Sequence, residues 1–192
     1  MSIFLETSRL ELRPVTARDL PHLIELGRDP EVMRHITGGR PTPPETVRDR
    51  VLPMLTREYP AWGNRGFWAA RERTGGRFVG WFELRPVAED SADVVELGYR
   101  LRRALWGLGY ATEGSRALLD KGFTELGVRK VTAHTMTVNT RSRRVLEKAG
   151  LTLLRTYFGD WPEAIEGSES GEVEYTLTRA DWIRAATGPT AE

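Results

Sequence analysis

A glycine-containing turn between an apolar strand and a helix is the feature that most constrains this chain. Residues 94–99 predict a strand, residues 114–123 predict a helix, and the intervening stretch contains Gly107 and Gly109. The first amides of a helix have no intrahelical partner, and the helix dipole adds partial positive charge there. Glycine lets the backbone approach an anion closely, so the stretch 101–113 predicts a phosphate-binding turn. Three arginines lie just before the glycines of this turn: Arg100, Arg102 and Arg103.

Composition narrows the class of protein. The 192 residues are enough for one domain with a full core, which we expect over residues 1–186, followed by a flexible tail at 187–192. The net charge of +1 gives no global electrostatic reason to expect nucleic acid or a membrane as a partner. The chain has no cysteine, which excludes a catalytic thiol and thiolate metal sites and fits a cytoplasmic protein; we expect no metal. Neither a signal peptide nor an apolar run of about 20 residues is apparent.

Hydrophobic periodicity predicts alternating strands and helices along the chain. An alternating stretch at 9–15 predicts a strand, and helical spacing predicts helices at 16–27, 29–36 and 45–59, the last kinked or broken at Pro53. Further strands are predicted at 67–72, 78–84, 94–101, 130–136, 151–157 and 173–177, and further helices at 114–127, 140–148 and 178–184. Hairpins early and strand–helix–strand units later predict an α/β chain with a mixed sheet and helices on both faces.

Four stretches together resemble the GCN5-related N-acetyltransferase (GNAT) family, and most closely its ribosomal-protein N-terminal acetyltransferase branch. They are LETSRLELRP at 5–14, ELGYRL at 96–101, WGLGYATE at 106–113 and NTRSRRVLEKAGL at 139–151. The resemblance covers roughly residues 6–179. It implies the GNAT fold, with a twisted, mostly antiparallel central sheet of about seven strands. It also implies acetyl-CoA as co-substrate.

The resemblance implies how acetyl-CoA is held. Backbone amides at 107–112 are expected to bind the pyrophosphate, and the strand at 99–101 to hydrogen-bond the pantetheine arm. Asn139 is either a cofactor contact or simply a helix N-cap. Basic residues of the following helix, with Arg102 or Arg103, either meet the nucleotide phosphates or form a solvated face. The residues expected to contact acetyl-CoA are Tyr99, Arg100, Leu101, Trp106, Gly107, Leu108, Gly109, Tyr110, Ala111, Thr112, Asn139, Ser142, Arg143 and Lys148.

Acetyl transfer from a thioester to an amine requires a deprotonated amine, a polarised carbonyl and a proton for the leaving thiolate. Holding both substrates together removes the need for a covalent enzyme intermediate. Many family members have a tyrosine general acid where this chain has Leu146, and the serine proposed as acid in the ribosomal branch corresponds to Ser142. For the base we favour Glu96 and then Glu83, strand carboxylates whose pKa burial would raise. His134 is a weaker alternative, because a lone histidine on a strand is more often structural.

Aromatic and histidine residues suggest where the acceptor binds. Trp81 is expected in the core, whereas Trp62 and Trp161 lie in predicted loops and are expected to shape the acceptor pocket. His22 and His35 are expected on helix surfaces or lining the acceptor cleft.

The leading prediction is an enzyme that moves an acetyl group from acetyl-CoA to a protein N-terminus or a small-molecule amine. One alternative is a catalytically inactive acyl-CoA sensor, because the family's tyrosine is missing. A nucleotide-binding protein of another fold is disfavoured, because the loop lacks the Gly-Lys-Ser/Thr ending of a P-loop. Dimers are frequent in the family, but no segment of the sequence fixes an interface.

Overall fold

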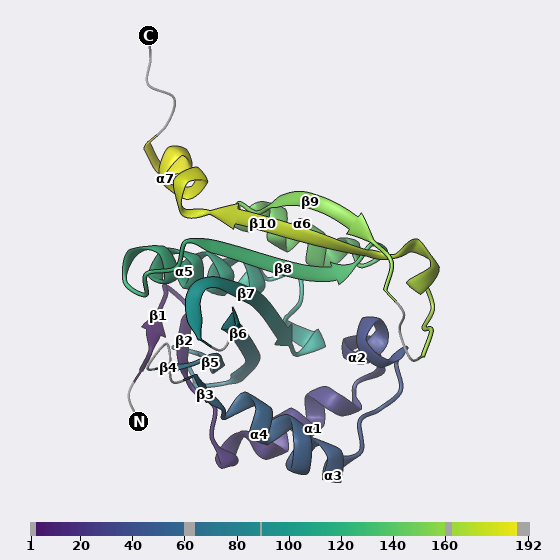
Figure 1. The fold of residues 1–192 in the computed structure, drawn as a ribbon. Helices are drawn as coiled ribbons and strands as arrows, with labels where there is room; N and C mark the ends of the chain where they lie inside the picture. Colours follow the sequence, from purple (N-terminus) through teal and green to yellow (C-terminus); the bar gives the residue numbers. More distant parts are fainter. Residues whose placement is uncertain (1–2, 60–63, 89, 160–162, 188–192) are drawn as a thin grey trace.

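The computed structural model describes residues 3–59, 64–88, 90–159 and 163–187, and its centre is one eight-stranded sheet (Figure 1). The strands, in their order across the sheet, are β1 (Leu5–Glu6), β2 (Leu10–Pro14), β5 (Phe67–Glu72), β6 (Phe78–Ala88), β7 (Ser91–Leu101), β8 (Lys130–Met136), β10 (Glu172–Thr178) and β9 (Thr152–Tyr157). A small second sheet pairs β3 (Glu58–Tyr59) with β4 (Asn64–Arg65). The helices are α1 (Leu20–Arg28), α2 (Pro30–Thr37), α3 (Pro44–Thr46), α4 (Leu52–Leu55), α5 (Tyr110–Thr124), α6 (Thr140–Ala149) and α7 (Arg179–Thr187).

Strand pairing in the described sheet is antiparallel except between β7 and β8. That parallel pair is joined through α5, as a parallel connection requires. The predicted mixed, mostly antiparallel sheet with helices on both faces is therefore confirmed, with eight strands where about seven were expected. Among the described residues, no helix combines the length and apolar character needed to cross a membrane.

Two hydrophobic clusters fix the helices to opposite faces of the sheet. One lies under α5 and α6 and includes Leu84, Leu97 and Phe123. The other lies under α1 and the segment 47–55 and includes Phe67 and Trp81, so the predicted core position of Trp81 holds. Leu97 of β7 pairs with Leu84 of β6, so these two side chains share the first face. Trp81 is three positions from Leu84 on β6, and because successive side chains of a strand point to opposite sides, it lies on the second face.

Close packing between α5 and the sheet sets the position of the glycine turn. Gly114 lies against the ring of Phe82, and a Cβ atom there would be 2.4 Å from Phe82 Cζ. Glycine thus lets the first turns of α5 lie directly on β6. This contact fixes the N-terminus of α5 just beyond the end of β7.

The structure changes three of the predicted boundaries. The helix predicted at 45–59 is a continuous helical segment over 44–55. It contains a π-helical stretch at Val47–Val51 and ends at Leu55. The amide of Leu52 bonds the carbonyl of Val47, five residues back, immediately before Pro53, which has no amide to donate. The helix predicted from residue 114 begins at Tyr110, and α7 extends to Thr187, so the rest of the predicted tail lies outside the described residues.

Candidate active site

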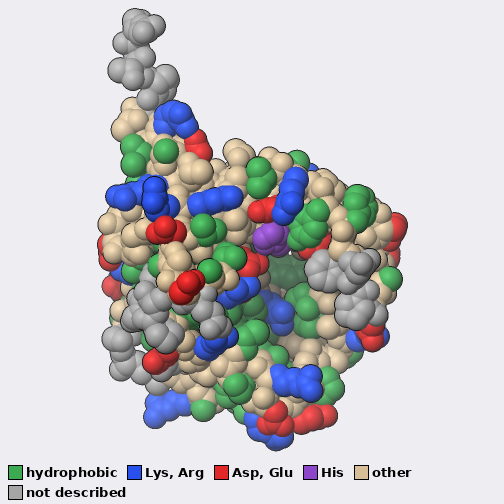
Figure 2. Space-filling model, viewed as in Figure 1, with side chains coloured by type: hydrophobic (Ala, Val, Ile, Leu, Met, Phe, Trp, Pro, Cys, Tyr) green, Lys and Arg blue, Asp and Glu red, His purple; other side chains and the backbone are tan. Residues whose placement is uncertain are grey.

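Divergence of β7 and β8 opens a cleft at the centre of the sheet. β7 pairs with β6 along its length, but with β8 only from Val94 to Glu96. Beyond Glu96 the β8-facing edge of β7, residues 97–101, is unpaired in the described structure. The hollow, visible in Figure 2, has a volume of about 1250 Å³ and is lined by both strands, the glycine turn, α6, α2 and residues 166–172.

The glycine turn forms one wall of this cleft. Gly107 and Gly109 have φ values of 78° and 85°, left-handed conformations that favour glycine. Gly109 immediately precedes the first residue of α5, so the unbonded amides of that helix face the turn. Trp106 Nε1 donates a hydrogen bond of 2.9 Å to the carbonyl of Leu101, which ties the turn to the end of β7. This wall has the geometry and partial charge of an anion site.

The segment before β2 braces this turn from behind. Arg9 Nε donates to Glu113 Oε2 at 2.6 Å, and Arg9 Nη1 donates to the carbonyl of Leu108 at 2.9 Å. The same guanidinium stacks 4.5 Å from the centre of the Tyr110 ring. Burial opposes the charge of Glu113, but hydrogen bonds from Thr7 and Arg9 hold the pKa of this carboxyl below its usual range. No local sequence pattern predicts this brace, because it joins residues about 100 positions apart.

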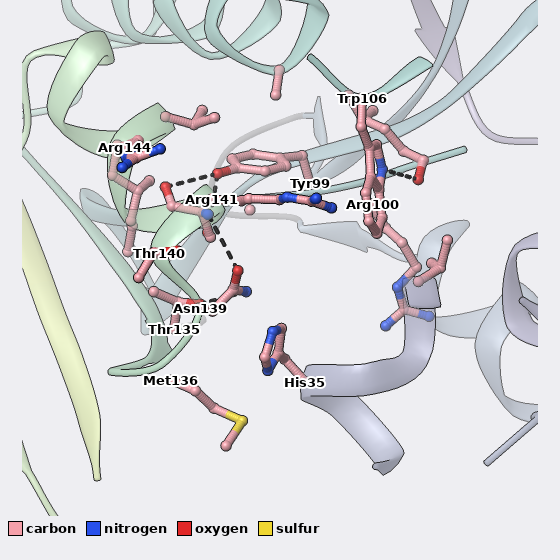
Figure 3. Close-up of a pocket in the computed structure, with 18 of the residues that line it drawn as sticks. His35, Tyr99, Arg100, Trp106, Thr135, Met136, Asn139, Thr140, Arg141 and Arg144 are labelled. Carbon is pink, nitrogen blue, oxygen red and sulfur yellow. Dashed lines mark hydrogen bonds between the residues drawn. The ribbon is translucent and has the colours of Figure 1, made fainter. Parts of the chain in front are cut away.

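Ser142 and Tyr99 meet on the opposite wall. Asn139 caps α6, its side-chain oxygen accepting from the Ser142 amide at 3.2 Å, so the N-cap alternative is realised. The Ser142 hydroxyl lies 3.0 Å from the Tyr99 hydroxyl, and both residues line the cleft (Figure 3). Burial raises the pKa of Tyr99 to about 12, so its phenol stays protonated at neutral pH. The sequence predicted the strand position of Tyr99, but not the contact of its hydroxyl with Ser142.

Two glutamates and an arginine form a cluster on the face of β6 and β7 opposite to that of Tyr99. Arg85 donates to Glu83 Oε1 at 2.8 Å and also forms an ion pair with Glu96. Glu83 stands opposite Gly98, where a Cβ atom would lie 3.1 Å from the Glu83 carboxylate, so this glycine leaves room for it. Burial, and then the charge of Glu96, raise the pKa of Glu83 to about 7. Burial and the neighbouring charge favour Glu83 as a base, whereas the sequence favoured Glu96 before Glu83.

Basic residues of α6 separate into two groups. Arg141, Arg144 and Lys148 line the cleft, together with Arg103. Arg143 turns away and donates to the Tyr175 hydroxyl at 3.1 Å and to the Thr137 carbonyl. Its expected contact with acetyl-CoA is not supported by this placement. Arg102 is likewise engaged elsewhere, in an ion pair with Glu25.

Most of the other predicted site residues are brought together. The cleft is lined by Tyr99, Arg100, Leu101, Trp106, Gly107, Gly109, Tyr110, Ala111, Thr112, Asn139, Ser142 and Lys148, as well as by Glu83 and Glu96. Leu108 is about half exposed and lies outside the lining. Trp62 and Trp161 lie outside the described residues.

The predicted histidines have different environments. His22 stacks on Phe78, with ring centres 4.6 Å apart, and does not line the cleft. His35 and His134 do line it. His134 Nδ1 lies 3.0 Å from the Tyr157 hydroxyl, which donates to Glu172 at 2.8 Å.

Comparison with known sequences decides the family. The sequence profile of the acetyltransferase (GNAT) domain matches residues 9–152, three quarters of the chain. The chain belongs to the GNAT acetyltransferase family. This GNAT protein is therefore an acetyl-CoA-dependent N-acetyltransferase.

Individual relatives and solved structures agree with the GNAT assignment. The chain is 37% identical over 188 residues to the FsC-acetyl coenzyme A-N(2)-transacetylase of Aspergillus fumigatus, covering 94% of this chain and 78% of the relative. The Vibrio cholerae spermidine N-acetyltransferase, solved with CoA and spermine, superposes with a TM-score of 0.74 at 16% identity, over 93% of this chain and all of the other. The aminoglycoside acetyltransferase AAC(6')-Ib, solved with coenzyme A, gives a TM-score of 0.70 at 21% identity, over 92% and 99% of the two chains. At these identities the two structures establish a shared fold only.

Proposed function

We propose that this protein acetylates a primary amine of a small molecule by direct transfer from acetyl-CoA. The observation that carries the proposal is the position of Glu83. This buried carboxylate, with a pKa of about 7, lines the same cleft whose opposite wall is the glycine turn. A carboxylate with that pKa accepts a proton from an ammonium group effectively near neutral pH.

The residues of the cleft fit acetyl-CoA. The amides of the turn and of the α5 N-terminus suit its pyrophosphate, and Arg103, Arg141 and Lys148 add positive charge on the same side. The unpaired edge of β7 at residues 97–101 can hold an extended pantetheine arm as an additional strand would be held. Bound there, acetyl-CoA supplies an activated thioester beside Glu83.

Three groups of this chain then divide the proton transfers. Glu83 takes the ammonium proton of the acceptor, which frees the nitrogen lone pair to form the new C–N bond. A backbone amide on the free edge of β7 donates to the carbonyl oxygen and stabilises its negative charge. The C–S bond breaks, Ser142 donates its hydroxyl proton to the sulfur, and Tyr99 reprotonates Ser142 across their 3.0 Å contact. The nitrogen loses its second proton as the amide forms; that proton restores the Tyr99 phenol through solvent in the cleft, and Glu83 releases the first proton to solvent. Neither wall needs to form a covalent bond with the acetyl group.

The acceptor end of the cleft supports a small molecule rather than a protein N-terminus. Helix α2 and the segment 163–170 join there into one wall, through an ion pair between Arg34 and Glu166 at 3.8 Å and contact of Gly38 with Ile165. A continuous wall at this end leaves little room for a folded partner. The relative and the two solved structures compared above are named for acetyl transfer involving FsC, spermidine and aminoglycosides, and none of the three is named for transfer to a protein N-terminus.

Three further predictions remain part of the proposal. The first is that the chain belongs to the ribosomal-protein N-terminal acetyltransferase branch, whose proposed acid is the serine that corresponds to Ser142. A cytoplasmic location is consistent with the lack of cysteine. We also retain a single catalytic domain over residues 1–186, with neither nucleic acid nor membrane as partner and with dimerisation left open.

The acid role can be tested with Ser142→Ala and Tyr99→Phe. We expect kcat in a thiol-release assay to fall by up to about 100-fold for Ser142→Ala, less for Tyr99→Phe, with near-normal acetyl-CoA binding by titration calorimetry. Ser91→Ala, at the far end of β7, should match the wild type. Unchanged kcat in Ser142→Ala would remove this serine from the mechanism. Transfer to an amine is tested with a broad panel of amines and peptides in the same thiol-release assay. If none of them raises thiol release above hydrolysis, the chain is a sensor and the proposed function is wrong.

A further inference from the structure

Arg100 is a cation on the acceptor side of the cleft without an ion-pair partner among the described residues. It stands opposite Trp81 in the β6–β7 register, so its side chain shares a face with Glu83 and Glu96 rather than with Tyr99. Its guanidinium stacks on the Trp81 ring at 5.2 Å from the ring centre. Burial lowers the pKa of Arg100 to about 10, because a charged guanidinium is disfavoured away from water.

The carboxylates along the same face already have other partners. Glu83 and Glu96 share Arg85, and Glu172 accepts from Tyr157. Glu83 influences Arg100 through its charge alone, without a hydrogen bond between them in the described structure. The charge of Arg100 is therefore compensated only in part by the protein.

His35 supplies a second polar group without a partner in the same part of the cleft. Its ring projects from α2 into the cleft, as Figure 3 shows, and its Nδ1 atom is buried with no hydrogen-bond partner. His35 also departs from helical geometry, with φ −96° and ψ 18° near the end of α2. Burial, and then the neighbouring Arg34, lower the pKa of His35, so its neutral ring offers one N–H donor. Buried polar groups normally have partners, so the unpartnered His35 Nδ1 and the unpaired charge of Arg100, which line the same cleft, indicate a ligand that interacts with both.

We infer that the acceptor carries a carboxylate or an equivalent oxyanion near its amine, and that Arg100, assisted by His35, binds this group. The inference rests on the proposed function and names its substrate class. Glu83 and Arg100 are diagonal neighbours on adjacent strands, a separation of roughly 7 Å at the backbone. An ammonium group at Glu83 and an anionic group at Arg100 then belong to one molecule with only a few bonds between them. Amino acids and their derivatives have this arrangement, whereas polyamines and aminoglycosides would place a second cation beside Arg100.

Matched pairs of acceptors test the inference. L-leucine is compared with isopentylamine, and L-ornithine with putrescine, each pair differing by the carboxylate, at saturating acetyl-CoA. We expect the wild type to favour the amino acid in kcat/KM by on the order of 10–100-fold, the range for loss of a charged hydrogen-bonding pair. Arg100→Gln should abolish this preference, Arg100→Lys should keep part of it, and His35→Gln should reduce it. The KM for acetyl-CoA should not change in any of them, and Arg129→Gln, an exposed arginine far from the cleft, should match the wild type.

Three results would overturn the inference: a preference for the decarboxylated amine, equal loss of both activities in Arg100→Gln, or acetylation confined to amines without an anionic group. In each of these cases the amine acetyltransferase function would stand. If no amine of any class raised thiol release, the proposed function itself would fail, and the substrate class would fail with it.

Discussion

Replacing Glu83 with glutamine separates its chemical role from its cost to stability. Glutamine keeps the shape and can still accept from Arg85, but it cannot take a proton from the acceptor. Removing a general base typically lowers the rate by about 10²–10⁴-fold, so we expect kcat/KM of Glu83→Gln to fall within that range. In the wild type, kcat/KM should rise with pH through about 7, where Glu83 ionises, and this rise should be absent in the variant.

The same substitution should stabilise the fold at alkaline pH. The pKa of Glu83 rises from 4.5 to about 7 on folding, because burial disfavours the ionised form. The folded state therefore binds the proton more tightly, and the contribution of Glu83 to stability falls as pH increases from about 4.5 to about 7. At about 1.4 kcal/mol per pKa unit, the variant should gain up to about 3 kcal/mol above pH 7. For a chain of this length that corresponds to a Tm increase of up to about 10 °C.

Both effects can be measured on one pair of proteins. Thiol release is followed against pH with an excess of amine, and Tm is followed by circular dichroism over the same pH values. Glu125→Gln, an exposed carboxylate near the end of α5, serves as the control and should change neither. A variant with wild-type activity, or a Tm difference that does not grow between about pH 5 and about pH 8, would refute the assignment of Glu83 as a buried base.

Three further predictions concern the residues around the cleft. Glu96→Gln should move the rise in kcat/KM to lower pH, because the charge of Glu96 helps raise the pKa of Glu83; an unmoved profile would show that the two carboxylates are uncoupled. Arg9→Gln should raise the KM for acetyl-CoA several-fold with little change in kcat, because it loosens the turn without touching the reacting atoms; an equal fall in kcat and kcat/KM would contradict this. Gly114→Ala should lower the free energy of unfolding by about 1–3 kcal/mol, measured by urea denaturation, because its methyl group would overlap the Phe82 ring; an unchanged midpoint would contradict the close contact.

The fold was largely predictable because local patterns and the family resemblance agree. Alternation predicted β2, and the helix predicted at 140–148 matches α6 to within a residue. What the patterns could not supply was the π-helical turn before Pro53. That turn depends on how the segment packs against the sheet as much as on its own residues.

The site was predictable only in part, because its chemistry depends on contacts between distant strands. The glycine turn and the α6 motif are continuous in sequence and were found from it. The choice between Glu83 and Glu96 depends on the burial of Glu83 and on the charge of Glu96 beside it, which follow from the pairing of β6 with β7. Arg100 was assigned to the cofactor from its place in the motif, whereas the register of β6 and β7 places its side chain on the same face as Glu83 and Glu96.

The most direct test of direct transfer is a single-turnover reaction followed by mass spectrometry of both enzyme and acceptor. The protein is mixed with acetyl-CoA alone, and then with acetyl-CoA and an amine accepted in the panel assay. The account predicts an unmodified enzyme mass in both mixtures, and an acetylated amine equal in amount to the free thiol in the second. An acetylated enzyme that forms without the amine and then passes its acetyl group to it would contradict the account, as would thiol release without any acetylated amine.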